Sequence, residues 1–144
     1  GKLKWLSSIA HRVGYSDHSS TLHEATALLA SKVALAKGAK TIERHFTSLP
    51  PSETKDGPVS VNKYLMRELI EFGSLSAADM NESVIEEFGE DLVLQAMGSG
   101  SLALSKEELL NRDYYRGRFA SVRQFGASAS DTRFIYNWEE VPID

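Results

Sequence analysis

Two short hydrophobic runs near the start of the chain enclose a segment with helical periodicity. The runs Arg12–Ser16 ("RVGYS") and Ala39–Phe46 ("AKTIERHF") contain β-branched or aromatic residues, which is typical of strands. The segment between them repeats apolar side chains on one helical face, at Leu22, Ala25, Leu29, Val33 and Ala36. A strand, a helix and a second strand in this order predict a βαβ unit with two parallel, adjacent strands.

Both ends of the predicted helix carry sequence signals. Thr21 and Glu24 have the spacing of a capping box, which predicts that the helix begins next to Thr21. Gly38 is placed to end the helix, because glycine tolerates the left-handed conformation common after a last helical turn. The fold class expected from this pattern is α/β.

The rest of the chain is mainly helical in its pattern. A loop rich in Pro, Ser and Gly, Thr47–Ser60, is long enough to be a binding loop or a lid. Helical periodicity follows at about Asn62–Phe72, Ala77–Phe88 and Glu90–Met97.

The last third has weaker signals. The stretch "SKEELLNRDYY" predicts a further capped helix from Ser105. Weak strand character is present at Ala120–Phe125 and Arg133–Trp138, and we expect Phe125–Thr132 to be a mobile linker.

Composition narrows the classes of function. A chain of 144 residues with 42% hydrophobic and 25% charged residues is long enough for about one globular domain. The net charge of −4 is spread along the chain without a Lys/Arg block, so we expect neither a nucleic-acid nor a membrane partner. The absence of cysteine excludes disulfides and thiolate metal sites, and it agrees with a cytoplasmic location.

The candidate chemistry lies at the ends of the two predicted strands. Side chains alternate along a strand, so Ser16 and His18 share a face, as do Glu43 and His45. Adjacent strands lie about 4.8 Å apart, so the two imidazoles can converge on one metal ion. Ser16, ahead of a helix, is placed to help hold a phosphate or carboxylate.

A structural role remains open for each histidine. A single histidine at a strand end more often forms a structural hydrogen bond than a metal bond, and only the pairing favours the metal. His11 and His23 have no such pairing, and we interpret them as surface or helix-cap residues. Glu43 has an alternative role as an ion-pair partner of Arg44 or Arg12.

The residues around both histidines resemble motifs of a known family. "GYSDHS" (Gly14–Ser19) and "GAKTIERHFT" (Gly38–Thr47) are similar to the G-[YL]-S-D-H-T and G-A-x-x-[IL]-E-[KR]-H-F-T motifs of the N-acetylneuraminate (sialic acid) synthases and their relatives. The resemblance extends from Leu3 to Ser121, and it is strongest in the first third.

The resemblance implies a function for each candidate residue. His18 and His45 correspond to the ligands of a divalent metal, manganese-like, with magnesium or cobalt as alternatives. Ser16 corresponds to a residue that contacts phosphoenolpyruvate, and Glu43 to a catalytic residue lining the same site. The implied reaction condenses phosphoenolpyruvate with an N-acyl hexosamine, such as N-acetylmannosamine, to a nonulosonic acid and phosphate, while the metal polarises the sugar aldehyde.

Two positions depart from the family pattern. Val59 stands where the family has an Asp that contacts the amino sugar, which leaves the choice of sugar open, with Asp56 as a candidate replacement. His18 and His45 are also 27 positions apart, several more than in familiar members, which predicts a longer helix between the motifs.

The resemblance implies only part of a barrel. Residues 1–121 correspond to the last two strand–helix units of a TIM-type (β/α)8 barrel followed by several helices, and residues 122–144 to a linker and tail. A complete barrel needs roughly 200 to 250 residues. We therefore expect an incomplete barrel as a lone chain, too short for activity alone and completed by a missing amino-terminal portion or by a homo-oligomer.

Two other functions are compatible with the sequence. The first is a non-catalytic metal- or sugar-binding or interaction module that completes the barrel of another chain. The second is an unrelated metal-dependent aldolase with a similar histidine pair.

Overall fold

The computed structural model describes residues 2–98, Gly100, Ala103, Lys106, Leu109, and residues 120–124 and 132–136. The chain divides into two compact units, Gly1–Ser101 and Leu102–Asp144, which are described separately below. The expected division into a family-related part, residues 1–121, and a tail, residues 122–144, stays a prediction.

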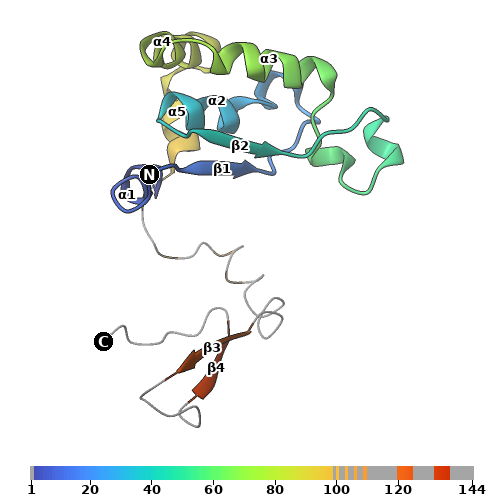
Figure 1. Ribbon diagram of the computed structural model, residues 1–144. Helices are drawn as coiled ribbons and strands as arrows, with labels where there is room; N and C mark the ends of the chain where they lie inside the picture. The colour runs from blue at the N-terminus through green and yellow to red at the C-terminus, as the bar shows by residue number, and fades with distance from the viewer. Residues whose placement is uncertain are drawn as a thin grey trace. The chain divides into compact units, whose positions relative to one another are not determined.

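The first unit contains a two-stranded parallel sheet. After a short helix α1 (Lys2–Leu6), strand β1 (Gly14–Asp17) pairs with β2 (Thr41–Arg44), and Ser16 lies opposite Glu43 (Figure 1). The predicted parallel, adjacent strands are therefore confirmed, with each strand shorter than the hydrophobic run that predicted it.

The helix between the strands begins later than predicted. Helix α2 covers Leu29–Ala36, and Glu24–Thr26 forms only a single 3₁₀ turn, η1. The capping box is wrong because the Thr21 hydroxyl donates instead to the carbonyl oxygens of Pro58 and Ser60. Residues 19–28, before α2, form a loop and this single turn, and Leu22 there is 66% exposed. The expectation that the helix is longer than in familiar family members stays a prediction.

Helix α2 ends where the sequence predicted. Lys37 is its C-cap, and Gly38 follows with φ at +99°. This left-handed conformation favours glycine, which has no Cβ to clash with the preceding turn.

Three further helices pack on α2. They are α3 (Lys63–Gly73), α4 (Ala77–Phe88) and α5 (Glu90–Met97), all within one residue of the predicted bounds. Side chains cap two of them: Asn62 accepts from the amides of Tyr64 and Leu65, and Ser76 from that of Asp79.

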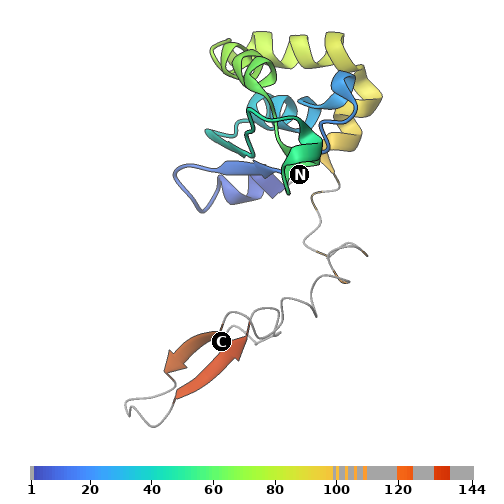
Figure 2. The same cartoon turned by 90° about the vertical axis from the view of Figure 1, so that its right-hand side faces the viewer.

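Helix α2 lies between the sheet and these three helices, in contact with both (Figures 1 and 2). The main core forms on the helical side, from Val33, Ala36, Phe72, Val84, Phe88 and Val93. A smaller cluster of Leu28, Val61 and Leu69 packs closer to β2, with Ile42 against it. The helices thus cover one face of the sheet.

The loop after β2 contains two 3₁₀ turns, η2 (Pro51–Glu53) and η3 (Gly57–Val59). Val61, at the end of this loop, forms a parallel bridge with Phe46. At Gly57 a Cβ atom would lie 1.8 Å from the Pro51 carbonyl oxygen, so only glycine fits this close backbone approach.

The second unit contains two strands that pair antiparallel, β3 (Ala120–Gln124) and β4 (Thr132–Tyr136), with Val122 opposite Phe134. The weak strands expected there are confirmed. Ser105 and most of its expected helix lie outside the described residues, although Lys106 and Leu109 are helical. The expected linker lies outside them as well, apart from Thr132, the first residue of β4.

The α/β class is confirmed by the parallel strands and the helices that cover them. The assignment to a TIM-type barrel stays a prediction. Within the described residues, no helix is both long and apolar enough to cross a membrane.

Candidate functional site

The four candidate residues share the sheet face opposite α2. Asp17 and Arg44 face the helical side, because Ser31 of α2 donates to Asp17 and Arg44 donates to the carbonyl oxygen of Ala27. Side chains alternate, so the neighbours of these two residues point to the other face. Ser16, His18 and Glu43 are exposed there, and His45 is partly exposed.

The two imidazoles lie next to each other. The ring centroids of His18 and His45 are 5.0 Å apart, with an angle of 60° between the ring planes. This proximity follows from the register, since Ser16 lies opposite Glu43 and each histidine is two residues further along its strand direction. His11 and His23 are exposed, and the His23 side chain does not cap η1.

A carboxylate lies close to one ring of this pair. Asp56 Oδ2 is 3.9 Å from Nδ1 of His45, and the Asp56 side chain is 59% exposed. The close packing of Gly57 on Pro51 restrains the loop next to Asp56. The Thr21 amide donates to the Pro58 carbonyl oxygen at 2.8 Å, which ties the loop after β1 to the loop after β2. Val59, where the family motif has Asp, is partly buried.

The donors present here fit an open metal site. Two imidazoles are typical ligands of divalent first-row metals, and their rings are close enough to share one ion. The described residues contain no group of three or more His, Asp, Glu or Cys side chains arranged to hold an ion. Two imidazoles would fill only part of the coordination shell of such an ion.

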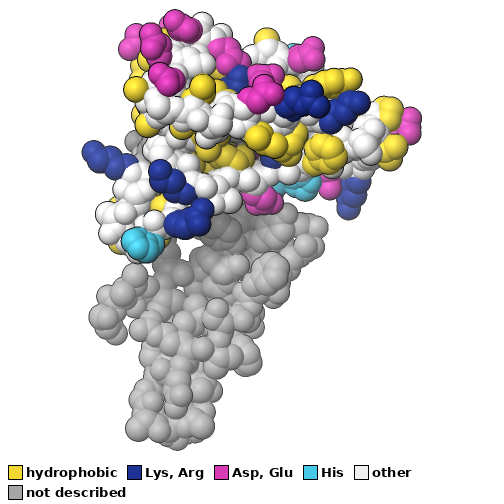
Figure 3. All heavy atoms as spheres, turned by 45° about the horizontal axis from the view of Figure 1, so that its top comes forward, with side chains coloured by type: hydrophobic (Ala, Val, Ile, Leu, Met, Phe, Trp, Pro, Cys, Tyr) yellow, Lys and Arg dark blue, Asp and Glu magenta, His cyan; other side chains and the backbone are white. Residues whose placement is uncertain are grey.

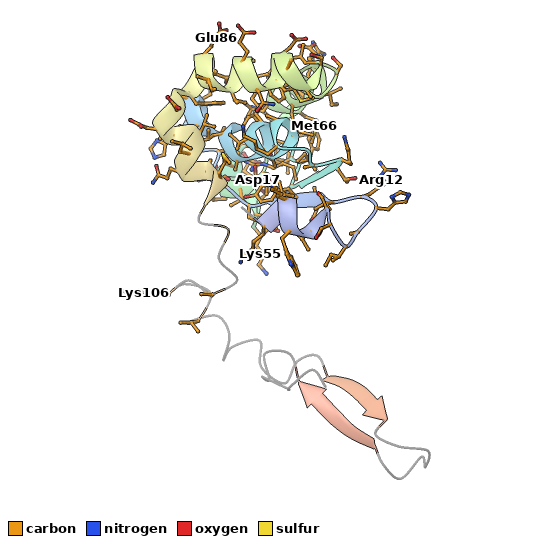
Figure 4. All side chains as sticks on the ribbon, turned by 90° about the vertical axis from the view of Figure 1, so that its left-hand side faces the viewer. Arg12, Asp17, Lys55, Met66, Glu86 and Lys106 are labelled. Atoms are coloured by element: carbon orange, nitrogen blue, oxygen red, sulfur yellow. The ribbon has the colours of Figure 1, made fainter. Side chains whose placement is uncertain are left out.

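An ion pair lies directly behind the histidines and was missed from the sequence. Arg44 Nη1 is 2.5 Å from Asp17 Oδ2, and both side chains are at most 1% exposed (Figure 4 labels Asp17 inside the first unit). Burial raises the pKa of Asp17, but hydrogen bonds from Ser19 and Ser31, together with the Arg44 charge, outweigh burial and hold it below its usual value. Asp17 is thus ionised at neutral pH.

The alignment of the two strands shows how the sequence could have predicted this ion pair. Asp17 and Arg44 lie directly opposite each other, one position before each histidine. Opposite charges at facing positions of neighbouring strands predict an ion pair once the strands are aligned. Its burial depends on α2, which the strand pattern alone does not place.

A separate cleft of about 630 Å³ lies beside the candidate site. Its lining includes Thr21, Phe46, Leu49, Asn62 and Tyr64, and it includes none of the four candidate residues. The cleft contains neither the imidazoles nor Glu43. The chemistry therefore points to the histidine pair and not to the cleft.

Comparison with known proteins identifies a family. The sequence model of the NeuB family matches residues 3–83, more than half of the chain. Both histidine motifs, Gly14–Ser19 and Gly38–Thr47, lie within the matched segment. Searches of curated proteins and of solved structures gave no match.

Proposed function

The chain belongs to the NeuB family, the sialic acid synthases, and from this membership we propose that it supplies the metal-binding edge of a synthase site. The proposed reaction joins phosphoenolpyruvate to an N-acyl hexosamine and yields a nonulosonic acid and phosphate.

One observation carries this proposal: the 5.0 Å approach of the His18 and His45 rings. The rings meet beyond the carboxyl ends of two adjacent parallel strands. Ligands of α/β proteins gather at such strand ends, because the loops there are free to present side chains.

We assign the metal to the histidines and the substrates to their neighbours. His18 and His45 would hold a manganese-like divalent ion, which when bound supplies Lewis-acid polarisation of the sugar aldehyde. The Ser16 hydroxyl is free to donate to the carboxylate or phosphate of phosphoenolpyruvate. Glu43, opposite Ser16 on the same face, accepts hydrogen bonds from the reacting sugar or from water.

Asp56 is our candidate for the sugar contact. Val59 has no polar side-chain atom, whereas the exposed Asp56 carboxylate lies 3.9 Å from His45. A carboxylate there accepts hydrogen bonds from sugar hydroxyls, so Asp56 compensates for the Val59 departure.

The described sheet of the first unit supplies only two strands to this site. We propose that the remaining wall, including the groups that neutralise the phosphate, comes from other strands of a TIM-type barrel. Either the rest of a longer protein or a partner chain provides these strands.

The test uses the protein as purified, with any polypeptide that accompanies it. Bound manganese and phosphate release from phosphoenolpyruvate plus N-acetylmannosamine are measured for His18→Ala and His45→Ala. His11→Ala and His23→Ala are matched controls, because both residues are exposed histidines outside the pair. We expect the first two variants to lose metal and activity and the controls to keep both. Retention of metal and activity in either pair variant would overturn the proposal.

A binding module is the second candidate function, favoured by the two-stranded sheet of the first unit. Manganese bound at the histidine pair without phosphate release, in a preparation that contains only this chain, would support this alternative. Phosphate release that co-purifies with a second polypeptide would support a split synthase.

A further inference from the structure

The buried ion pair Asp17–Arg44 lies directly before both histidines, where it can control the distance between their rings. Asp17 immediately precedes His18, and Arg44 immediately precedes His45. The two residues are register partners, and the Nη1–Oδ2 contact joins β1 to β2 at their last paired position. We propose that this pair is a positioning device that sets the distance between the two imidazoles. The use of that distance for metal binding rests on the proposed function.

The hydrogen bonds of Asp17 and Arg44 hold the backbone on both sides of His18. Asp17 Oδ1 accepts from the Ser19 amide at 2.8 Å and also from the Ser19 hydroxyl. Arg44 Nη2 donates to the carbonyl oxygens of Ser19, at 2.9 Å, and Ala27, at 3.0 Å. The residues before and after His18 are thus bound to the same ion pair, which restricts movement of the peptide that carries its ring.

His45 is fixed from two sides as well. Arg44 anchors the preceding position, and the His45 carbonyl oxygen accepts from the Val61 amide at 2.8 Å. The Thr47 amide donates to the Val61 carbonyl oxygen at 3.0 Å. Both histidine backbones therefore belong to one network, and its only charged link between the strands is Asp17–Arg44 among the described residues.

Stability alone does not account for the charges of this pair. Burial of two charges carries a desolvation penalty that apolar residues of similar size avoid. A directional guanidinium, which here contacts Asp17 through Nη1 and two backbone carbonyl oxygens through Nη2, fixes the relative position of two segments better than apolar contacts do. Ser31, from α2, adds a donor to Asp17 and so ties the device to the helical layer.

Neither member of the pair is a catalytic residue. Both side chains face α2, whereas the histidines face the opposite side of the sheet. The ion pair Asp17–Arg44 acts only through the histidines. Its loss should therefore change the positions of the two rings directly, and the reaction only as a consequence. Contacts that orient metal ligands commonly affect metal affinity by about 10- to 100-fold.

The test compares Arg44→Lys and Asp17→Asn with the wild-type chain and with Val84→Ala. Val84 is fully buried in the helical core, so its truncation lowers stability without touching the pair. Two properties are measured by NMR of histidine-labelled protein: the nuclear Overhauser effect between the two rings without metal, and selective broadening of the four histidines by Mn²⁺. We expect the ring-to-ring effect to vanish and manganese to bind at least about tenfold more weakly in both pair variants, but not in Val84→Ala.

The proposal is overturned if either pair variant, still folded, keeps the ring-to-ring effect and the wild-type manganese affinity. Equal losses in Val84→Ala would overturn it too, because general destabilisation would then suffice. Should neither single variant fold, the double variant Asp17→Leu/Arg44→Leu takes their place, with the same expectations.

The two measurements also separate this inference from the proposed function. If manganese broadens His11 and His23 as much as His18 and His45 in the wild-type chain, the metal assignment fails. The ring-to-ring effect without metal still decides whether Asp17 and Arg44 position the histidines.

Discussion

At the scale of single residues, buried charged side chains directly neighbour the more exposed side chains of the candidate site. Asp17 is fully buried and ionised, while its neighbours Ser16 and His18 are exposed on the other face. A similar contrast exists at the end of β2, where the Arg44 side chain is 1% exposed and that of the following residue, His45, is 36% exposed. The alternation of a strand therefore lets a few residues provide both an internal anchor and a reactive surface.

The Asp17 carboxylate should make stability depend on acid pH. Its pKa in the folded protein lies below the ordinary value of 3.8, so the unfolded chain takes up the proton more readily. The contribution of Asp17 is fully present above that ordinary value and is lost as the pH falls through the lower folded pKa. Urea unfolding of metal-free protein at several pH values below 5 should show a smaller decrease for Asp17→Asn than for the wild type. Equal slopes for the two proteins would contradict this assignment.

Gly57 should tolerate no side chain. Gly57→Ala places a methyl group 1.8 Å from the Pro51 carbonyl oxygen, so the loop next to Asp56 must move. We expect a loss of about 1–3 kcal/mol in the free energy of unfolding, as for other overpacked sites.

Gly73→Ala is the matched control for this substitution. At the end of α3 the new methyl group would meet only Leu35 Cδ1, at an ordinary 3.8 Å. Denaturant unfolding should therefore give a neutral or slightly stabilising effect, within about 1 kcal/mol. A similar loss in both variants would show that the contact with Pro51 is not the cause.

At the scale of elements, sequence motifs correctly predicted the helix ends that depend on contacts between residues close in sequence. Helices α3, α4 and α5 combine apolar periodicity with a polar residue or glycine directly before each, and their bounds were predicted closely. The start of α2 was not, because Thr21 finds its acceptors in the loop around Pro58, far along the chain. A capping motif is informative only when no distant acceptor competes for its hydroxyl group.

Some features of the candidate site could likewise be predicted from the sequence, and others could not. The approach of His18 and His45 could be predicted, because parallel pairing and strand alternation fix it. The burial of Asp17 and Arg44 could not, since it depends on how α2 packs across the sheet. The proximity of Asp56 to His45 results from loop contacts between distant residues, for which the sequence has no local pattern.

Lys32 of α2 should contribute to stability mainly through its aliphatic chain. Its ammonium group contacts Glu68 and Glu87, each at 2.6 Å, and lies 5.5 Å from the Phe72 ring centroid. Both glutamates are partly exposed and can be hydrated when the lysine is replaced. Lys32→Met should therefore change the free energy of unfolding by less than about 1.5 kcal/mol.

Lys32→Ala is the comparison that isolates the aliphatic chain. It removes the buried aliphatic chain as well as the charge, and it should cost about 2 kcal/mol or more. Both values come from denaturant unfolding at neutral pH. Equal losses in the two Lys32 variants would show instead that the ion pairs dominate.

At the scale of the whole molecule, the described surface suggests association. Hydrophobic side chains are scattered among charged ones over the helical side of the first unit (Figure 3). The exposed hydrophobic residues include Ile70 of α3, at 65%, and Ile85 of α4, at 47%. Among the described residues, no further strand pairs with the edges of the two-stranded sheet in this unit. We expect sedimentation of the purified chain to give a species larger than a monomer, or a complex with a partner. A well-folded monomer at micromolar concentration would contradict this prediction.

We propose that His18 and His45 jointly hold one divalent ion in this NeuB family protein. Anomalous diffraction from crystals grown with manganese tests it most directly, because the method locates the ion without relying on activity. We predict a single manganese peak about 2.1 Å from one nitrogen of each ring, with the remaining positions filled by water. A manganese ion bound to only one of the two rings, or at other residues with the pair empty, would contradict the shared-ion assignment.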